Sequence, residues 1–145
     1  PLNGPRTLVF DRRGDVYLAL REGNAVYRID GRTRTLHHVA GSGQQGYGGD
    51  GGPARDATLA GPKGLAWHHD TLYIADTENH VIRAVDLRRG LIRTVLGTGR
   101  PGDGPEPDPR RCALDRPHGL LVDRHGALYV TDREAHRIRV VTDPV

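Results

Sequence analysis

The 145-residue sequence contains no methionine, one cysteine, one phenylalanine and one tryptophan. Because Cys112 is the only cysteine, a disulfide within the chain is excluded. The cysteine content therefore does not indicate whether the protein works in a reducing or an oxidising compartment. No apolar run approaches the roughly 18 residues that a membrane-spanning helix needs, so we expect no membrane contact. A secretory leader pattern is also missing, and the localisation remains unassigned. Since the chain starts at Pro1 and lacks methionine, we expect it to have been processed or cut from a longer one.

Lysine is almost absent too, because Lys63 is the only one and the formal charge of +3 comes from arginine. A mild excess of this kind, spread along the chain, favours a GC-rich coding sequence over an anionic partner. Glycine and proline are abundant, with 20 and 10 residues. This composition favours many short strands and turns over long helices.

Three tyrosines recur at a constant interval of 56 residues: Tyr17, Tyr73 and Tyr129. Each lies in a short apolar run, with a proline upstream and a basic, apolar stretch downstream. Three copies at one spacing are typical of a repeat architecture.

Each repeat predicts a sheet of four short strands, which in the second copy span residues 64–67, 71–75, 80–86 and 91–96. The second of these strands, around Tyr73, is apolar on both faces. Burial on both faces is expected when sheets stack around an axis, as in a β-propeller.

We therefore predict an all-β fold of four-stranded antiparallel blades, with about two and three-quarter blades in this chain. The expected boundaries are 5–59 for blade 1, 60–114 for blade 2 and 115–145 for a partial blade 3. Glycine-rich connectors join successive blades. Because propellers close with about four to eight blades, the ring would be completed by dimerisation or by the rest of a longer chain.

Residues 72–86 resemble the NHL repeat, which is named for Asn-His-Leu. Asn79, His80 and Val81 occupy the naming triplet, with valine in place of leucine. The third copy keeps most of the pattern, whereas the first copy departs from it. The resemblance covers nearly the whole chain and implies a propeller, commonly six-bladed, of which this chain would be about half.

The polar residues of the repeat are expected to be structural, because they can satisfy backbone donors in the turn between the second and third strands. The arginines can then reach carboxylates on the same or the next blade. These residues are Asp76, Asn79, His80 and Arg83 in the second copy and Asp132, His136 and Arg139 in the third.

Three other residues are candidates for ligand binding: Arg6, Lys63 and His118. Each follows the proline that precedes the first strand of its repeat, which places it at one mouth of the central channel. Convergent positive charge would attract a carboxylate, a phosphate or an acidic peptide. We therefore expect a non-enzymatic interaction scaffold that binds a protein, a peptide or a small anionic ligand, without a cofactor.

Three alternatives remain open. The sequence around His118 also resembles peptidylglycine amidating lyases, whose channel histidines hold zinc, and related propellers hydrolyse lactones. Only one such histidine is present here, although a catalytic zinc usually takes three protein ligands. Binding of single-stranded RNA would need exposed aromatic residues, for which only Tyr47 and Tyr27 are candidates. Asp50 and Asp103 in the connectors are the candidates for calcium.

Overall fold

The structure is a computed structural model that describes residues 2–104 and 107–145. In this part of the chain, eleven strands form three antiparallel sheets, and the only helices are three single turns of 3-10 helix. None of these helices has the length and apolar character required to cross a lipid bilayer. The predicted all-β fold is confirmed.

The sheets follow one another along the chain. Blade 1 contains β1 (Pro5–Phe10), β2 (Val16–Leu20), β3 (Ala25–Ile29) and β4 (Leu36–Ala40). Blade 2 contains β5 (Gly64–His68), β6 (Thr71–Asp76), β7 (Val81–Asp86) and β8 (Leu91–Leu96). Blade 3 contains β9 (Pro117–Val122), β10 (Leu128–Asp132) and β11 (Arg137–Val141). The 3-10 turns are η1 (Ala54–Asp56), η2 (Thr77–Asn79) and η3 (Pro109–Arg111).

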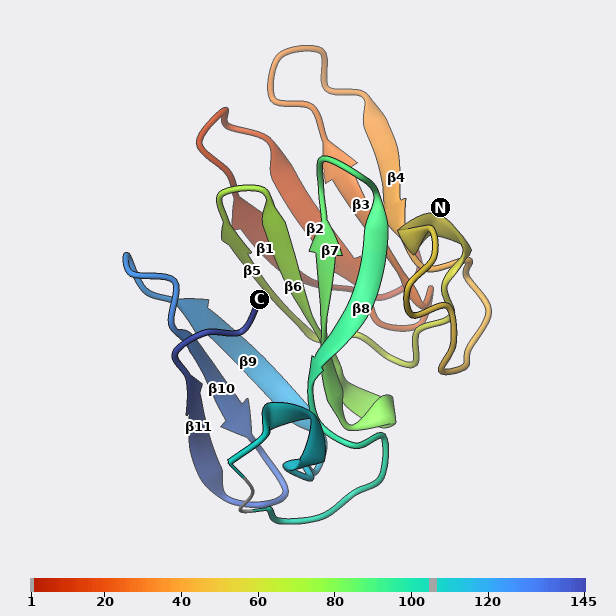
Figure 1. The fold of residues 1–145 in the computed structure, drawn as a ribbon. Coiled ribbons are helices and arrows are strands. Elements are labelled where there is room, and N and C mark those ends of the chain that lie inside the picture. The colour runs from red at the N-terminus through yellow and green to blue at the C-terminus, as the bar shows by residue number, and fades with distance from the viewer. Residues whose placement is uncertain (1, 105–106) are drawn as a thin grey trace.

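Strand order within each sheet equals the order in the sequence, and Figure 1 shows the three sheets standing beside one another like sectors of a ring. The strand predictions for the second repeat are correct to within one residue at each end. The third strand begins at Val81 rather than at His80, because His80 has a left-handed backbone (φ 58°) that closes η2.

Two apolar cores lie between the blades. The first joins Tyr17 of β2 to Leu72 and Ile74 of β6. The second joins Tyr73, on the opposite face of β6, to Leu128 and other residues of blade 3. Both faces of β6 are therefore buried, as its unbroken apolar sequence predicts.

The outer faces of blades 1 and 3 are open among the described residues. Cross-strand pairing shows that Leu8 occupies the repeat position of Leu65, but Leu8 is 62% exposed and Leu65 only 6%. At the other end, Ile138 is 72% exposed, whereas its counterpart Ile82 is fully buried. Tyr129 is accordingly only half-buried, although the repeat predicts a tyrosine sandwiched between sheets. Each open face thus has the chemistry of a buried inter-blade face.

Gly64 sets the distance between blades 2 and 3. A Cβ at this position would lie 1.9 Å from the carbonyl oxygen of His118 in β9. The first repeat has Thr7 at the same position, so blade 1 cannot approach β5 in the same way. The inner strands of blades 2 and 3 can therefore pack more closely than those of blades 1 and 2.

A Gly64→Ala substitution is therefore expected to destabilise the chain by about 1–3 kcal/mol, the usual cost of overpacking a core. Chemical denaturation of the 145-residue chain measures this change. Gly52→Ala is the matched control, because a Cβ there would make only an ordinary contact, 3.4 Å from a backbone oxygen. Equal stability of the two variants would contradict the role assigned to Gly64.

Candidate functional site

The starts of β1, β5 and β9 lie at the same end of the three blades, and the predicted mouth residues Arg6, Lys63 and His118 stand there, each just after its proline. Their environments differ. Arg6 is exposed and makes no ion pair with the described residues, whereas Lys63 is only 7% exposed.

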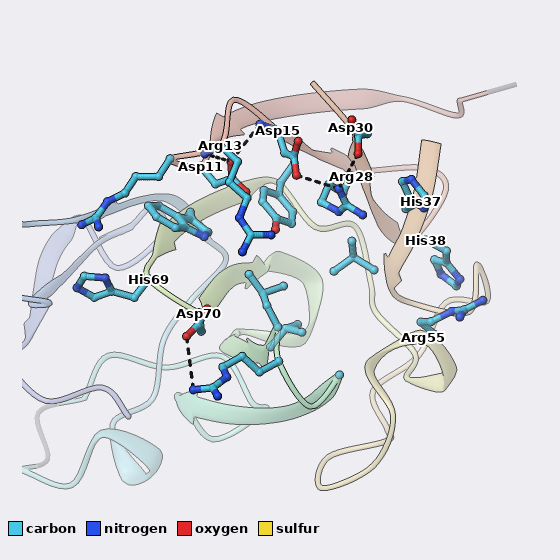
Figure 2. A pocket seen from close by; sticks show the side chains of 18 of the residues that line it. Asp11, Arg13, Asp15, Arg28, Asp30, His37, His38, Arg55, His69 and Asp70 are labelled. Atoms are coloured by element: carbon cyan, nitrogen blue, oxygen red, sulfur yellow. Dashed lines mark hydrogen bonds and ion pairs between the residues drawn. The ribbon is translucent and has the colours of Figure 1, made fainter. Parts of the chain in front are cut away.

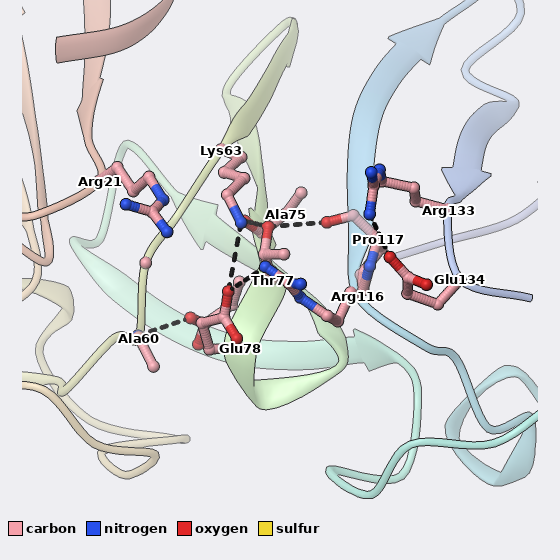
Figure 3. Close-up of polar contacts among 12 residues, drawn as sticks. Arg21, Ala60, Lys63, Ala75, Thr77, Glu78, Arg116, Pro117, Arg133 and Glu134 are labelled. Atoms are coloured by element: carbon pink, nitrogen blue, oxygen red, sulfur yellow. Dashed lines mark hydrogen bonds and ion pairs between the residues drawn. The ribbon is translucent and has the colours of Figure 1, made fainter. Parts of the chain in front are cut away.

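Glu78 of η2 bridges the mouth between blades 2 and 3. Its Oε1 atom accepts a hydrogen bond from Lys63 Nζ at 3.2 Å and another from Arg116 Nη2 at 2.7 Å. Figure 3 shows these side chains converging on Glu78, with Arg21 and Arg133 on either side. Burial lowers the pKa of Lys63, and the bonds to Glu78 oppose that shift. One carboxylate thus serves two cations from different blades.

His118 is neutral at neutral pH. Burial, followed by the positive charges of Lys63, Arg133, Arg116 and Arg6, lowers its pKa to about 4. Its Nε2 atom is buried without a hydrogen-bond partner among the described residues. Lys63 and Arg6, the other two predicted mouth residues, are among the cations that lower the pKa of His118.

Arg21 and Arg133 belong to the same mouth, and they were not among the predicted residues. They flank Thr77 at intervals of 56 residues and follow the second strand of their blades. The repeat spacing predicts this position, because residues 21, 77 and 133 are equivalent in the three repeats and therefore lie at the same end of the sheets. Each arginine pairs with the glutamate next to it in the sequence, Glu22 or Glu134.

The repeat motif forms a buried polar network around Asp76. The carboxylate accepts hydrogen bonds from the backbone N–H of Ala60 and from Asn79 Nδ2, both at 2.8 Å, and lies 3.5 Å from Arg83 Nη1. Burial raises the pKa of Asp76 to about 6, and these hydrogen bonds work against that rise. Asp76 and Arg83 are both completely buried.

Arg83 also clamps the glycine-rich connector that precedes its blade. It donates to Asp50 Oδ1 at 2.8 Å, to the carbonyl of Gly48 at 2.8 Å and to that of Thr58 at 2.7 Å. Tyr47 covers the guanidinium, with its ring centre 5.2 Å away. The carboxylate of Asp50 is therefore engaged in structural bonds, which disfavours the calcium alternative at this connector.

The same clamp recurs in blade 3. Arg139 donates to Asp132 Oδ2 at 3.0 Å and to Asp103 Oδ1 at 2.8 Å, and Asp132 accepts the backbone N–H of Asp115 at 2.7 Å. Blade 1 has Leu20 and Tyr27 at the positions of the aspartate and the arginine. Because blade 1 lacks both the aspartate and the arginine of this pair, no buried charge is left without a partner there.

The histidine of the motif acts between blades rather than within its turn. His80 Nδ1 accepts the backbone N–H of Arg116 at 3.1 Å, and Asn24, at the same repeat position, accepts that of Gly61 at 2.9 Å. All three residues at this position, including His136, have positive φ values. His136 is exposed, because the described chain provides no following blade for it to contact.

The described residues contain no group of three or more His, Cys, Asp or Glu side chains arranged to hold a metal ion. Arg6 and Lys63 occupy the mouth positions equivalent to that of His118. The zinc-dependent alternative therefore has one of its usual three ligands within this part of the chain.

Comparison with known proteins agrees with this geometry. The model of the NHL repeat family matches residues 114–141. The chain therefore carries an NHL repeat. NHL repeat-containing protein 2 of Gallus gallus is 28% identical over 127 residues, which are 86% of this chain and 17% of that protein. The resemblance to NHL-repeat propellers is confirmed.

Solved structures show the same fold. A structural genomics protein of unknown function from Bacteroides thetaiotaomicron aligns with a TM-score of 0.82 and 22% identity, over 94% of this chain and 34% of that chain. Virginiamycin B lyase from Staphylococcus aureus aligns with a TM-score of 0.59 and 14% identity, over all of this chain and 43% of that one. The chain thus spans less than half of each of these two proteins, and the likeness concerns the fold alone.

Removal of the Asp76 carboxylate tests the structural role of the motif. Asp76→Ala is expected to destabilise the chain by about 3–5 kcal/mol, because Arg83 would lose a buried partner and the N–H of Ala60 its acceptor. Thermal and chemical denaturation measure the loss. Arg88→Ala is the control and is expected to change stability by less than about 0.5 kcal/mol, since Arg88 is exposed and lies 4.0 Å from Asp70. An unchanged melting temperature for Asp76→Ala would refute the assignment.

Proposed function

We propose that this chain is part of a non-enzymatic propeller scaffold whose basic mouth binds an anionic group of a protein, a peptide or a small ligand. The observation that carries the proposal is the cluster of Arg6, Lys63, Arg116 and Arg133 around the neutral, half-buried His118, with Lys63 and Arg116 both bound to Glu78. Carboxylates are fewer than cations here, and Glu78 already serves two of them. A positive site with partly buried walls attracts anions more strongly than an open surface does.

The arrangement of the mouth also suggests how an anion would enter. Arg6 has no ion-pair partner among the described residues, so its guanidinium is available at once. The carboxylate of Glu78, which belongs to η2 at the rim, is held by Lys63 and Arg116. A ligand carboxylate could be held in the same place. An incoming anion would bind Arg6 and compete with Glu78 for Arg116, whose side chain is partly exposed.

Enzymatic and RNA-binding alternatives receive less support. A zinc-dependent lyase or a lactone hydrolase needs clustered ligands, and this part of the chain offers His118 alone. The two aromatic candidates for base stacking are engaged within the chain: Tyr27 stacks on His38 with ring centres 5.1 Å apart, and Tyr47 donates to or accepts from Thr94 at 2.7 Å. Stacking on free aromatic faces is what single-stranded RNA binding requires.

The mouth proposal is tested by titrating the 15N-labelled chain with glutarate and with inorganic phosphate. Saturable shifts are expected for the backbone amides of Thr77 and Gly119, which flank the mouth. Arg6→Glu should weaken binding about tenfold, because an attractive charge becomes a repulsive one. Arg93→Glu, on the outer strand β8, is the control and should bind as the parent does. Identical affinities for the two variants would overturn the proposal.

We further propose that the open faces of blades 1 and 3 are covered by another set of blades, either in a second copy of this chain or in the rest of a longer one. The support is the exposure of Leu8, Leu121 and Ile138, residues whose counterparts in blade 2 are covered by a neighbouring blade. An uncovered apolar face of this kind favours association.

Sedimentation equilibrium at micromolar concentration measures the mass of the chain in solution, and this mass shows whether a second copy covers these faces. If two copies pair, the mass is expected to be twice 15.9 kDa. Ile138→Lys should then shift the equilibrium toward the monomer, because a charge would be buried without a partner. A stable monomer in the unsubstituted chain would contradict self-association and leave the longer chain as the source of the missing blades.

A further inference from the structure

A second candidate site lies between blades 1 and 2, at the end of the strands opposite the mouth. It is a groove of about 1050 Å3, bounded by the β1–β2 and β3–β4 turns of blade 1 and the β5–β6 turn of blade 2. Both walls belong to this chain. The groove is therefore complete whatever closes the rest of the ring.

The floor of the groove is apolar and aromatic. Tyr17 from blade 1 and Trp67, Val85 and Leu87 from blade 2 line it, and these residues also belong to or pack against the core between the two blades. Tyr17 and Val85 are buried in this core, and Trp67 is the half-buried aromatic side chain that the groove exposes.

The carboxylates of Asp11 and Asp15 in the blade 1 wall are already committed to bonds within the chain. Asp15 pairs with Arg28 at 2.8 Å and accepts the backbone N–H of Gly31 at 2.9 Å. Asp11 accepts the backbone N–H groups of Arg13 and Asp15. These bonds hold the β1–β2 turn in place, and Arg28 offsets the charge of Asp15.

The cations of the walls are not all committed in this way. The guanidinium groups of Arg13 and Arg55 make no ion pair with the described residues, and both side chains are exposed. Figure 2 shows Arg13 extending into the space between the blades, while Arg55 stands beside His37 and His38 at one end of it. The groove therefore presents free positive charge above an aromatic floor.

We propose that this groove binds an acidic segment of a polypeptide in which carboxylates alternate with apolar side chains. The groove extends across turns of both blades, with Arg13 and Arg55 at different places along it, which favours an extended chain over a compact metabolite. Trp67 is the one Phe, Tyr or Trp side chain of the lining that is not buried, whereas single-stranded nucleic acids stack successive bases on several such rings, which disfavours a nucleic acid. Carboxylates of the segment pair with Arg13 and Arg55, and its apolar side chains pack on Trp67.

Trp67 makes a direct test possible, because it is the only tryptophan in the sequence and it lines the groove. The probe is an end-blocked octapeptide of alternating glutamate and leucine or glycine, which has no tryptophan of its own. Titration into the 145-residue chain should change the emission of Trp67 saturably. Isothermal titration calorimetry gives the affinity independently of any change that a variant makes to the emission.

The double variant Arg13→Glu/Arg55→Glu is expected to weaken peptide binding at least about tenfold, because two attractive charges become repulsive. Arg93→Glu, on the outer strand β8, is the control and should keep the parent response of Trp67, which lines the groove and not the mouth. The proposal is overturned if the emission of Trp67 does not respond, or if the double variant binds as the parent does. It is also overturned if a lysine version of the peptide or single-stranded RNA of equal charge binds as tightly.

Discussion

Stacking of sheets through both faces of their second strands is the constraint on which the rest of this structure depends. A strand such as β6 has no polar face to present to water, so it is stable only between two neighbours. Blade 2 has both neighbours, and its core residues are almost inaccessible. Blades 1 and 3 have one each, and their outer faces carry the exposed apolar side chains. Each repeat thus has two apolar faces that are buried only when a blade packs on either side of it.

The buried aspartate–arginine pair serves this stacking in a second way. Arg83 and Arg139 each tie a connector to the blade that follows it, through an aspartate of the connector itself. A buried pair of this kind contributes little net free energy but makes the loss of either partner costly. Its role here is to hold the glycine-rich connectors in one position. The mouth and the groove then lie on fixed elements at opposite ends of the sheets.

Much of the fold could be predicted from the sequence, because strand burial and repeat spacing are local patterns. The predicted strands of the second repeat agree with the structure to within one residue, and the three predicted mouth residues lie at the starts of β1, β5 and β9. The bridging role of Glu78 was missed, since its partners come from two different blades. His80 was assigned to its own turn, whereas it binds the backbone of the next blade. Contacts between repeats depend on the angle and spacing of the sheets, which no single repeat encodes.

The amino-acid sequence alone determined the all-β class, the number of strands and the burial of both faces of β6, because unbroken apolar runs and turn residues act within one repeat. Tertiary structure alone decided that Lys63 is buried against Glu78 while Arg6 is free, and that a groove opens between blades 1 and 2. These features follow from how closely neighbouring sheets approach, as at Gly64 and Thr7. Side-chain volume at such contacts acts only once the blades are packed.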